Sequence, residues 1–127
     1  MFKQDYLLKQ ISQMTKVVLK IFFGLDVDKE GEEYDFEDVE SLTLFNDLKS
    51  MVDIGKIGDA EDKMFDVIEN NMSRENLKTA LLFYDYLNRK DDDFLEMNNF
   101  SRKEIEMGVK DVIKMYEIEE DVNKLLL

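Results

Sequence analysis

The stretch DYLLKQISQMTKVVLKIFFGL, residues 5–25, has the most regular apolar pattern in this chain. Its apolar residues recur at steps of four and three, the spacing of one face of an amphipathic helix: Leu7, Ile11, Met14, Val18, Ile21 and Leu25. Leu8 and Phe22 widen this stripe beyond what a two-stranded coiled coil uses, which favours packing in a bundle. We therefore predict an amphipathic N-terminal helix over residues 1–25, ended by Gly24.

Helical patterns continue along the rest of the chain, which has no proline to interrupt them. Apolar residues at helical spacing predict further helices over residues 36–55, 59–71, 73–88 and 101–118. Asp59 and Ser73 are the predicted N-caps of the second and third of these. The last begins with the capping box Ser101-Arg102-Lys103-Glu104, in which the serine and glutamate side chains bond the first amides. The sequence predicts an all-α fold, a helical bundle of about five helices.

Length and charge predict how the chain is organised. Its 127 residues suit a single helical domain over residues 1–127 with one core. Residues 26–40 hold nine acids and one lysine. We therefore predict an acidic loop over residues 26–35, between the N-terminal helix and a helical core over residues 36–118.

One predicted helix pair has the spacing of a known repeat. Gly55, Ile57, Ala60, Met64 and Val67 follow the second half of a tetratricopeptide repeat (TPR), in which two antiparallel helices interlock. The following residues do not repeat this pattern. Two interpretations remain open, a repeat array and a plain helix pair, so we predict a bundle with TPR-like antiparallel helix pairs.

The residue types that are missing exclude several kinds of chemistry. Without histidine or cysteine, the chain has no zinc site of the Cys/His kind, no disulfide, no thiol nucleophile and no Ser-His-Asp triad. A net charge of −13 disfavours nucleic-acid binding. The longest apolar stretch, residues 17–25, is interrupted by Lys20 and is too short to span a membrane. We expect a cytoplasmic protein, since cysteine is absent, with no membrane or nucleic-acid partner and no cofactor.

The acidic segment partly matches the calcium loop of an EF-hand, with oxygens at positions 1, 3, 5 and 12 and glycine at position 6: Asp26, Asp28, Glu30, Gly31 and Glu37. Position 8, which is usually apolar, is Glu33, and the glutamate at position 5 is longer than the residues that fit there. A partial match also arises easily in so acidic a segment. We interpret it as a solvated linker and expect no metal-ligating residue.

Several stretches together carry a resemblance to a known family. They are Met1-Phe2-Lys3-Gln4-Asp5-Tyr6, Gly55-Lys56-Ile57 with Ala60-Glu61, Phe83-Tyr84-Asp85-Tyr86-Leu87-Asn88, and Asn98-Asn99-Phe100-Ser101-Arg102-Lys103-Glu104-Ile105. In these stretches the chain resembles an uncharacterised Firmicutes family of small acidic helical proteins, classed as a domain of unknown function. The resemblance implies a helical, often tetratricopeptide-like protein, and it carries over no activity, ligand or catalytic residue.

Two functional hypotheses from different classes remain. The first is a non-enzymatic helical interaction module that binds a protein partner or itself, because this needs none of the absent chemistry. Residues 1–25 carry four lysines against one acid and apolar residues on much of the helix circumference, so we predict a homodimer through this helix. The alternative is a small carboxylate-based enzyme that depends on a divalent metal, or a calcium-binding protein. The first hypothesis is the one we favour, with no enzyme activity and no catalytic or cofactor-binding residue.

Overall fold

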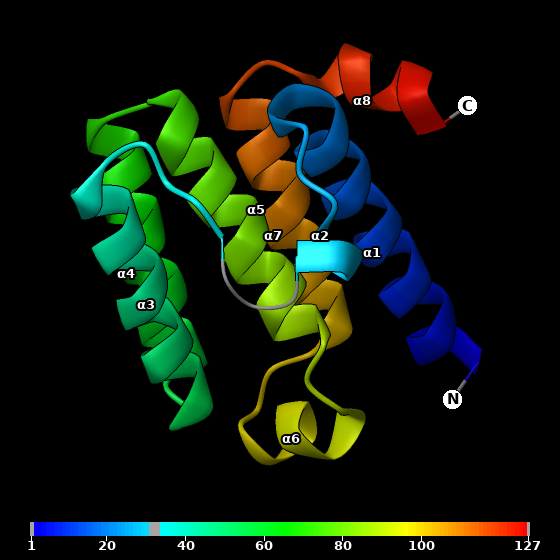
Figure 1. The fold of residues 1–127 in the computed structure, drawn as a ribbon. Coiled ribbons are helices and arrows are strands. Elements are labelled where there is room, and N and C mark those ends of the chain that lie inside the picture. The colour runs from blue at the N-terminus through cyan, green and yellow to red at the C-terminus, as the bar shows by residue number, and fades with distance from the viewer. Residues whose placement is uncertain (1, 31–33, 127) are drawn as a thin grey trace.

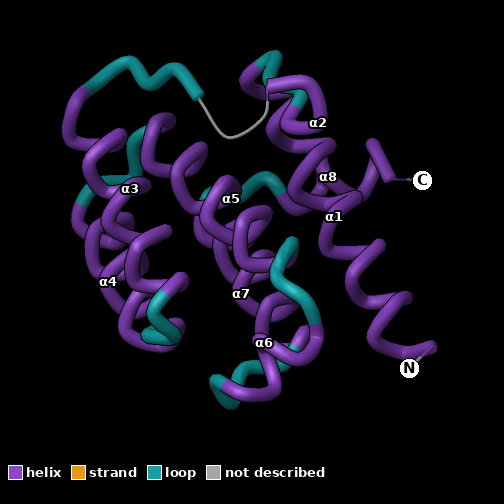
Figure 2. Tube along the Cα trace, turned by 60° about the horizontal axis from the view of Figure 1, so that its bottom comes forward, coloured by secondary structure: helices purple, strands orange, loops and turns teal. Residues whose placement is uncertain are grey.

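The computed structural model describes residues 2–30 and 34–126, and this part of the chain is helical without any strand (Figures 1 and 2). The helices are α1 (Phe2–Phe23), α2 (Val27–Glu30), α3 (Val39–Asp53), α4 (Ile57–Asn70), α5 (Arg74–Asn88), α6 (Asp92–Met97), α7 (Arg102–Met115) and α8 (Glu119–Leu126). Among the described residues α1, α3, α4, α5 and α7 are long, with 14 or more residues each. The all-α prediction is confirmed, and the short helices α2, α6 and α8 add to the predicted count of about five.

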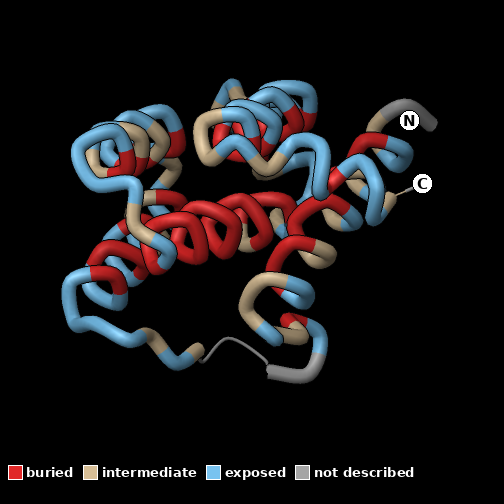
Figure 3. Tube along the Cα trace, turned by 90° about the horizontal axis from the view of Figure 1, so that it is seen from above, coloured by how far each residue is buried: buried red, intermediate tan, exposed pale blue. Residues whose placement is uncertain are grey.

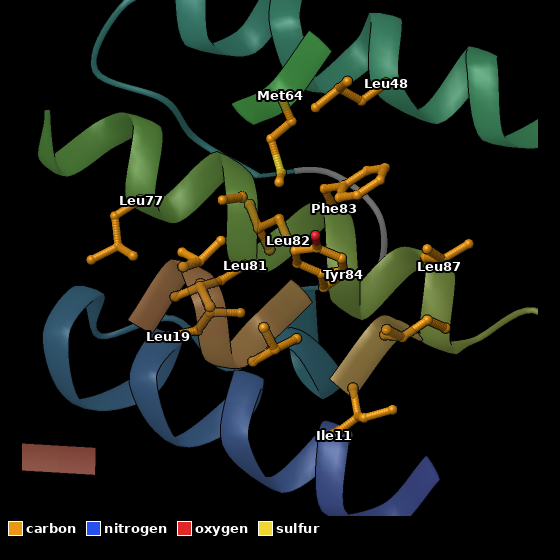
Figure 4. Packing of buried hydrophobic residues seen from close by; sticks show 14 of the residues in the cluster. Ile11, Leu19, Leu48, Met64, Leu77, Leu81, Leu82, Phe83, Tyr84 and Leu87 are labelled. Atoms are coloured by element: carbon orange, nitrogen blue, oxygen red, sulfur yellow. The ribbon is translucent and has the colours of Figure 1, made fainter. Parts of the chain in front are cut away.

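Helix α5 lies in the middle of the molecule, between two layers of helices (Figure 1). It contacts α3 and α4 on one side and α1 and α7 on the other. Thirteen of its 15 residues are buried, and Figure 3 shows them as a continuous red stretch. In Figure 4, Leu48 and Met64 lie against one side of α5, and Ile11 and Leu19 against the other. The sequence predicted one apolar face for this helix, but both layers pack on it and bury it all round.

Two of the predicted helix starts are confirmed by their caps. Ser73 and Ser101 are N-caps, and the capping box is complete. The Ser101 hydroxyl accepts a hydrogen bond from the Glu104 amide at 3.1 Å, and the Glu104 carboxylate accepts one from the Ser101 amide at 2.8 Å. Helix α3 begins three residues later than predicted, at Val39, because the carboxylate of Asp38 caps it.

The predicted N-cap of α4 is wrong. This helix begins at Ile57, so Asp59 lies in its first turn, where a negative charge still favours a helix N-terminus. Gly55 has a φ of +84°, which reverses the chain directly after α3. The side chain of Ile57 is buried in the core. Its burial places the first turn of α4 earlier in the sequence than the predicted cap, Asp59, indicated.

The predicted acidic loop over residues 26–35 is interrupted by a helical turn. Gly24 ends α1 as predicted, with a φ of +64°. The chain then folds into α2, Val27–Glu30, because the side chain of Val27 is buried in the core. Residues 31–33 lie outside the described part of the chain.

Helices α5 and α7 lie close together at Gly108. A β-carbon added there would lie 2.2 Å from the hydroxyl oxygen of Tyr84, so only glycine fits. That hydroxyl donates a hydrogen bond of 2.6 Å to the carboxylate of Glu61 on α4. Burial raises the pKa of Tyr84, and the neighbouring Glu61 carboxylate raises it further. This group links three helices as a neutral hydrogen-bond donor.

Arg102, at the start of α7, holds the end of α5 in place. Its side chain is only 2% exposed. Its Nη1 atom donates to the backbone and side-chain oxygens of Asn88, at 2.7 and 3.0 Å, and its Nη2 atom donates to the Lys90 carbonyl at 2.7 Å. Asn88 in turn donates to the Leu8 carbonyl of α1 at 3.0 Å. The guanidinium therefore satisfies carbonyl groups that the end of α5 leaves without helical partners.

Candidate functional site

The residues of the candidate calcium loop hold the acidic segment against the bundle. The carboxylate of Asp28 pairs with Lys16 of α1 at 3.0 Å and with Arg89 at 3.6 Å. The hydrogen bond from Lys16 lowers the pKa of Asp28. Asp26 accepts a hydrogen bond from the Asp28 amide, and the Glu37 amide donates to the Glu75 carboxylate of α5. Gly31 and Glu33 lie outside the described residues, and among those described no acidic group is placed to hold a metal ion.

A partly open cavity of about 140 Å³ lies between α2, α3 and α5. We call it the α2 cavity. Its apolar and aromatic walls are formed by Val27, Tyr34, Phe45 and Leu82, and its polar walls by Asp28, Lys49, Asp85, Tyr86 and Arg89. Figure 1 shows α2 in front of the bundle, between α1 and α5.

Aromatic rings dominate one side of the α2 cavity. The ring of Phe45 is buried and meets the edge of the Tyr34 ring at a centroid distance of 5.9 Å. The ammonium of Lys49 lies 4.8 Å from the centre of the Phe45 ring and 5.9 Å from that of Tyr86. Lys49 forms no ion pair within 4.0 Å with a described carboxylate. Ring faces therefore help to stabilise its charge, together with the longer-range attraction of the Asp53 carboxylate.

The carboxylates of the α2 cavity are already paired. Asp85, on α5, is 4% exposed and binds the Nε atom of Arg89 at 2.9 Å. Burial raises the pKa of Asp85, and the Arg89 guanidinium opposes this shift. Tyr86 donates its hydroxyl hydrogen to the carboxylate of Asp53. The ammonium of Lys49 forms no ion pair within 4.0 Å among the described residues, and the Asp53 carboxylate that attracts it from further away is bonded to Tyr86 and Lys90.

A second concave surface lies where α1 ends and α5 begins. This end groove has a volume of about 290 Å³ and is lined by Phe22, Phe23, Met72, Arg74, Leu77, Tyr116 and Ile118. The Arg74 guanidinium lies 4.6 Å from the centre of the Phe23 ring and donates to the Phe22 carbonyl. The Tyr116 hydroxyl donates to the Ser73 carbonyl at 2.9 Å, and burial raises the pKa of Tyr116 to about 12. The groove is fixed by these bonds and open to solvent, with Met72 43% exposed.

The apolar stripe predicted on the N-terminal helix is used inside the chain. Leu7, Ile11, Met14 and Val18 are buried, together with Leu19, where α1 packs on α5 and α7. The large apolar residues that remain exposed on the described face of α1 are Tyr6, at 66%, and Ile21, at 57%. Less apolar surface is therefore available for the predicted homodimer than the sequence suggested, and that dimer stays a prediction.

Sequence reasoning did not find the residues of the two concave surfaces as sites. Phe22 belonged to the predicted apolar stripe of α1, but nothing in the sequence indicated that Arg74 would lie against the end of that helix. Asp85 and Arg89 are spaced as a helical ion pair, which was the one local signal for the α2 cavity. Lys49 comes from a different helix, and only the tertiary fold brings it there.

Comparison with known proteins gives one finding. A family model described as "Family of unknown function (DUF6483)" matches residues 1–117. No curated protein and no solved structure matches the chain, so the likeness to tetratricopeptide repeats stays a prediction. Within the described residues, no helix combines the length and the apolar character that crossing a bilayer requires.

Proposed function

The chain belongs to the DUF6483 family, whose function is unknown, and we propose from its own surface that it is a non-enzymatic, helical protein-interaction module. The observation that carries this proposal is the end groove. Phenylalanine, tyrosine, methionine and arginine are enriched in the cores of protein interfaces, and the groove gathers all four types. A rigid apolar surface of this kind, open to solvent, is typical of a site that receives a partner's apolar side chain.

The two carboxylates whose pKa is raised by burial support a binding function over an enzymatic one. Burial raises the pKa of Glu61, which accepts the Tyr84 hydroxyl group, and burial also raises the pKa of Asp85, which binds Arg89. Glu61 joins α4 to α5, Asp85 pairs with Arg89 at the end of its own helix, and neither lines the end groove. We assign the module to the cytoplasm, because the chain has no cysteine.

Site-specific photo-crosslinking tests the proposal. A photoreactive benzoylphenylalanine replaces Met72, at the rim of the end groove, and in a matched control it replaces Met107, which is 56% exposed on α7. We expect a protein adduct from position 72 and none from position 107. The captured protein, once purified, should bind the wild-type chain. Its affinity for the Met72→Asp variant should be at least about tenfold lower, which corresponds to a loss of about 1.4 kcal/mol in binding free energy. Equal adducts at both positions, or none at position 72, would contradict the proposal.

Two further measurements address self-association and the metal-dependent alternative. Light scattering gives a mass near 15.1 kDa for a single chain and twice that for the predicted homodimer.

The thermal unfolding midpoint in millimolar Mg²⁺ or Ca²⁺ should equal the midpoint measured in the presence of a chelator. A ligand at about 100 times its dissociation constant adds about 2.7 kcal/mol, so a rise of that size would favour the metal-dependent enzyme or calcium-binding protein instead.

A further inference from the structure

The α2 cavity has features of a ligand site that the fold alone does not require. It combines an ammonium group that forms no ion pair within 4.0 Å among the described residues, several aromatic rings and a volume of about 140 Å³. A half-buried lysine usually gains stability by pairing with a carboxylate, because removing an unpaired charge from water is costly. Lys49 instead has the faces of Phe45 and Tyr86, while the nearby carboxylates of Asp28 and Asp85 are bound to other cations.

The local charge indicates an anion with a single negative charge. Among the described residues, four cations, Lys16, Lys49, Arg89 and Lys90, accompany the three carboxylates of Asp28, Asp53 and Asp85, which leaves one positive charge in excess. A monoanion would neutralise this excess. A phosphate dianion would exceed it, and the chain's net charge of −13 also repels multiply charged anions.

The walls and the volume restrict the rest of the ligand. Tyr34, Phe45 and Leu82 form a surface that favours an apolar body. An engineered protein cavity of about 150 Å³ holds benzene, so this volume suits about six carbon atoms. A peptide backbone does not fit in a space of that size, so the ligand is a small molecule.

We propose that the α2 cavity binds a small organic monocarboxylate, whose carboxylate accepts hydrogen bonds from the Lys49 ammonium and whose apolar body lies against Phe45 and Leu82. The bond to Lys49 is charge-assisted, the stronger class of hydrogen bond. The Arg89 guanidinium, fixed by Asp85 at 2.9 Å, supplies a second positive charge in the lining of the cavity. This site is separate from the end groove, so neither proposal depends on the other.

The experiment uses benzoate as the probe and benzamide as its neutral isostere. The full chain, labelled with ¹⁵N, is titrated at pH 7 and constant ionic strength while amide shifts are followed by NMR. For benzoate we expect saturable shifts that centre on the amides of Phe45, Leu82 and Tyr86. Benzamide, which lacks the charge, should bind about 10 to 100 times more weakly, the range for one hydrogen bond to a charged group. Because this comparison uses the wild-type chain, it does not depend on the folding of any variant.

A lysine variant and its control test the assignment to Lys49. Lys49→Met should weaken benzoate binding by the same factor of about 10 to 100. Lys63→Met removes an exposed lysine that pairs with Asp47 across α3 and α4, and it should leave binding unchanged. The proposal is overturned by benzoate shifts that stay linear with concentration, by equal binding of benzamide and benzoate, or by equal effects of the two lysine variants.

Discussion

Replacement of Arg102 by methionine should destabilise this protein more than the loss of any other arginine. Methionine keeps an unbranched apolar chain but removes every donor, so the carbonyl groups of Asn88 and Lys90 lose partners at 2.7 Å. A buried carbonyl left without a partner costs about 1–3 kcal/mol, so two of them cost about 2–6 kcal/mol. The pair with Asp92 adds little, because that carboxylate is 59% exposed. We expect a loss of about 2–6 kcal/mol, because the substitution leaves two backbone carbonyls without a partner but leaves no buried charge unpaired.

Urea denaturation followed by circular dichroism measures this loss. Domains of this size have about 5–15 kcal/mol of stability, so the midpoint should fall steeply or the variant should be unfolded without urea. Arg74→Met is the matched control, because Arg74 is exposed and donates to a single carbonyl, and it should cost about 1 kcal/mol. Arg102→Lys keeps the positive charge but lacks the planar guanidinium group, so its urea midpoint should lie between the midpoints of the other two variants. Equal midpoints for Arg102→Met and Arg74→Met would refute the reasoning.

Three other substitutions test separate parts of the fold. Ser101→Ala removes the N-cap hydroxyl of α7 and should cost about 1 kcal/mol in urea denaturation, and an unchanged midpoint would mean that the capping box contributes nothing. Gly108→Ala places a methyl group against Tyr84 and should cost about 1–3 kcal/mol, whereas Gly58→Ala, which meets no neighbour, should stabilise α4 by about 0.5–1 kcal/mol. The folded-state pKa of Glu61 lies above its unfolded value near 4.5, so its charge destabilises the fold once the pH exceeds the folded pKa. Glu61→Gln should therefore raise the urea midpoint at pH 7, and this gain in stability should disappear below about pH 4. A lower midpoint for Glu61→Gln at pH 7 would show that the charge is needed.

Local sequence signals predicted the parts of the fold that depend on local chemistry. The capping box at Ser101 and the helix end at Gly24 are where the sequence placed them, because caps and positive φ values are properties of a few neighbouring residues. The sequence also identified the buried face of α1 from its periodicity, apart from Ile21. That residue follows the helical spacing but is 57% exposed.

The features that were missed depend on contacts between distant segments. Arg102 looked like a polar residue inside a capping box, yet it is buried because α5 ends beside it. Lys78 of α5 is also buried, and its ammonium donates to the Asp35 carbonyl at 2.6 Å. Such residues carry no local mark of burial, since the carbonyl oxygens that they bind lie more than ten positions away in the sequence. The α2 cavity was missed for the same reason.

The position of α5 between two helix layers has a consequence for how the molecule opens. When either layer detaches, one side of α5 is exposed to water while the other side stays covered. The backbone amides of α5 therefore exchange with solvent only when both layers have separated, which amounts to global unfolding. Hydrogen exchange should be slowest in residues 77–87, and protection there should report the full free energy of unfolding. The helices of the outer layers should exchange faster, through partial openings that leave α5 intact.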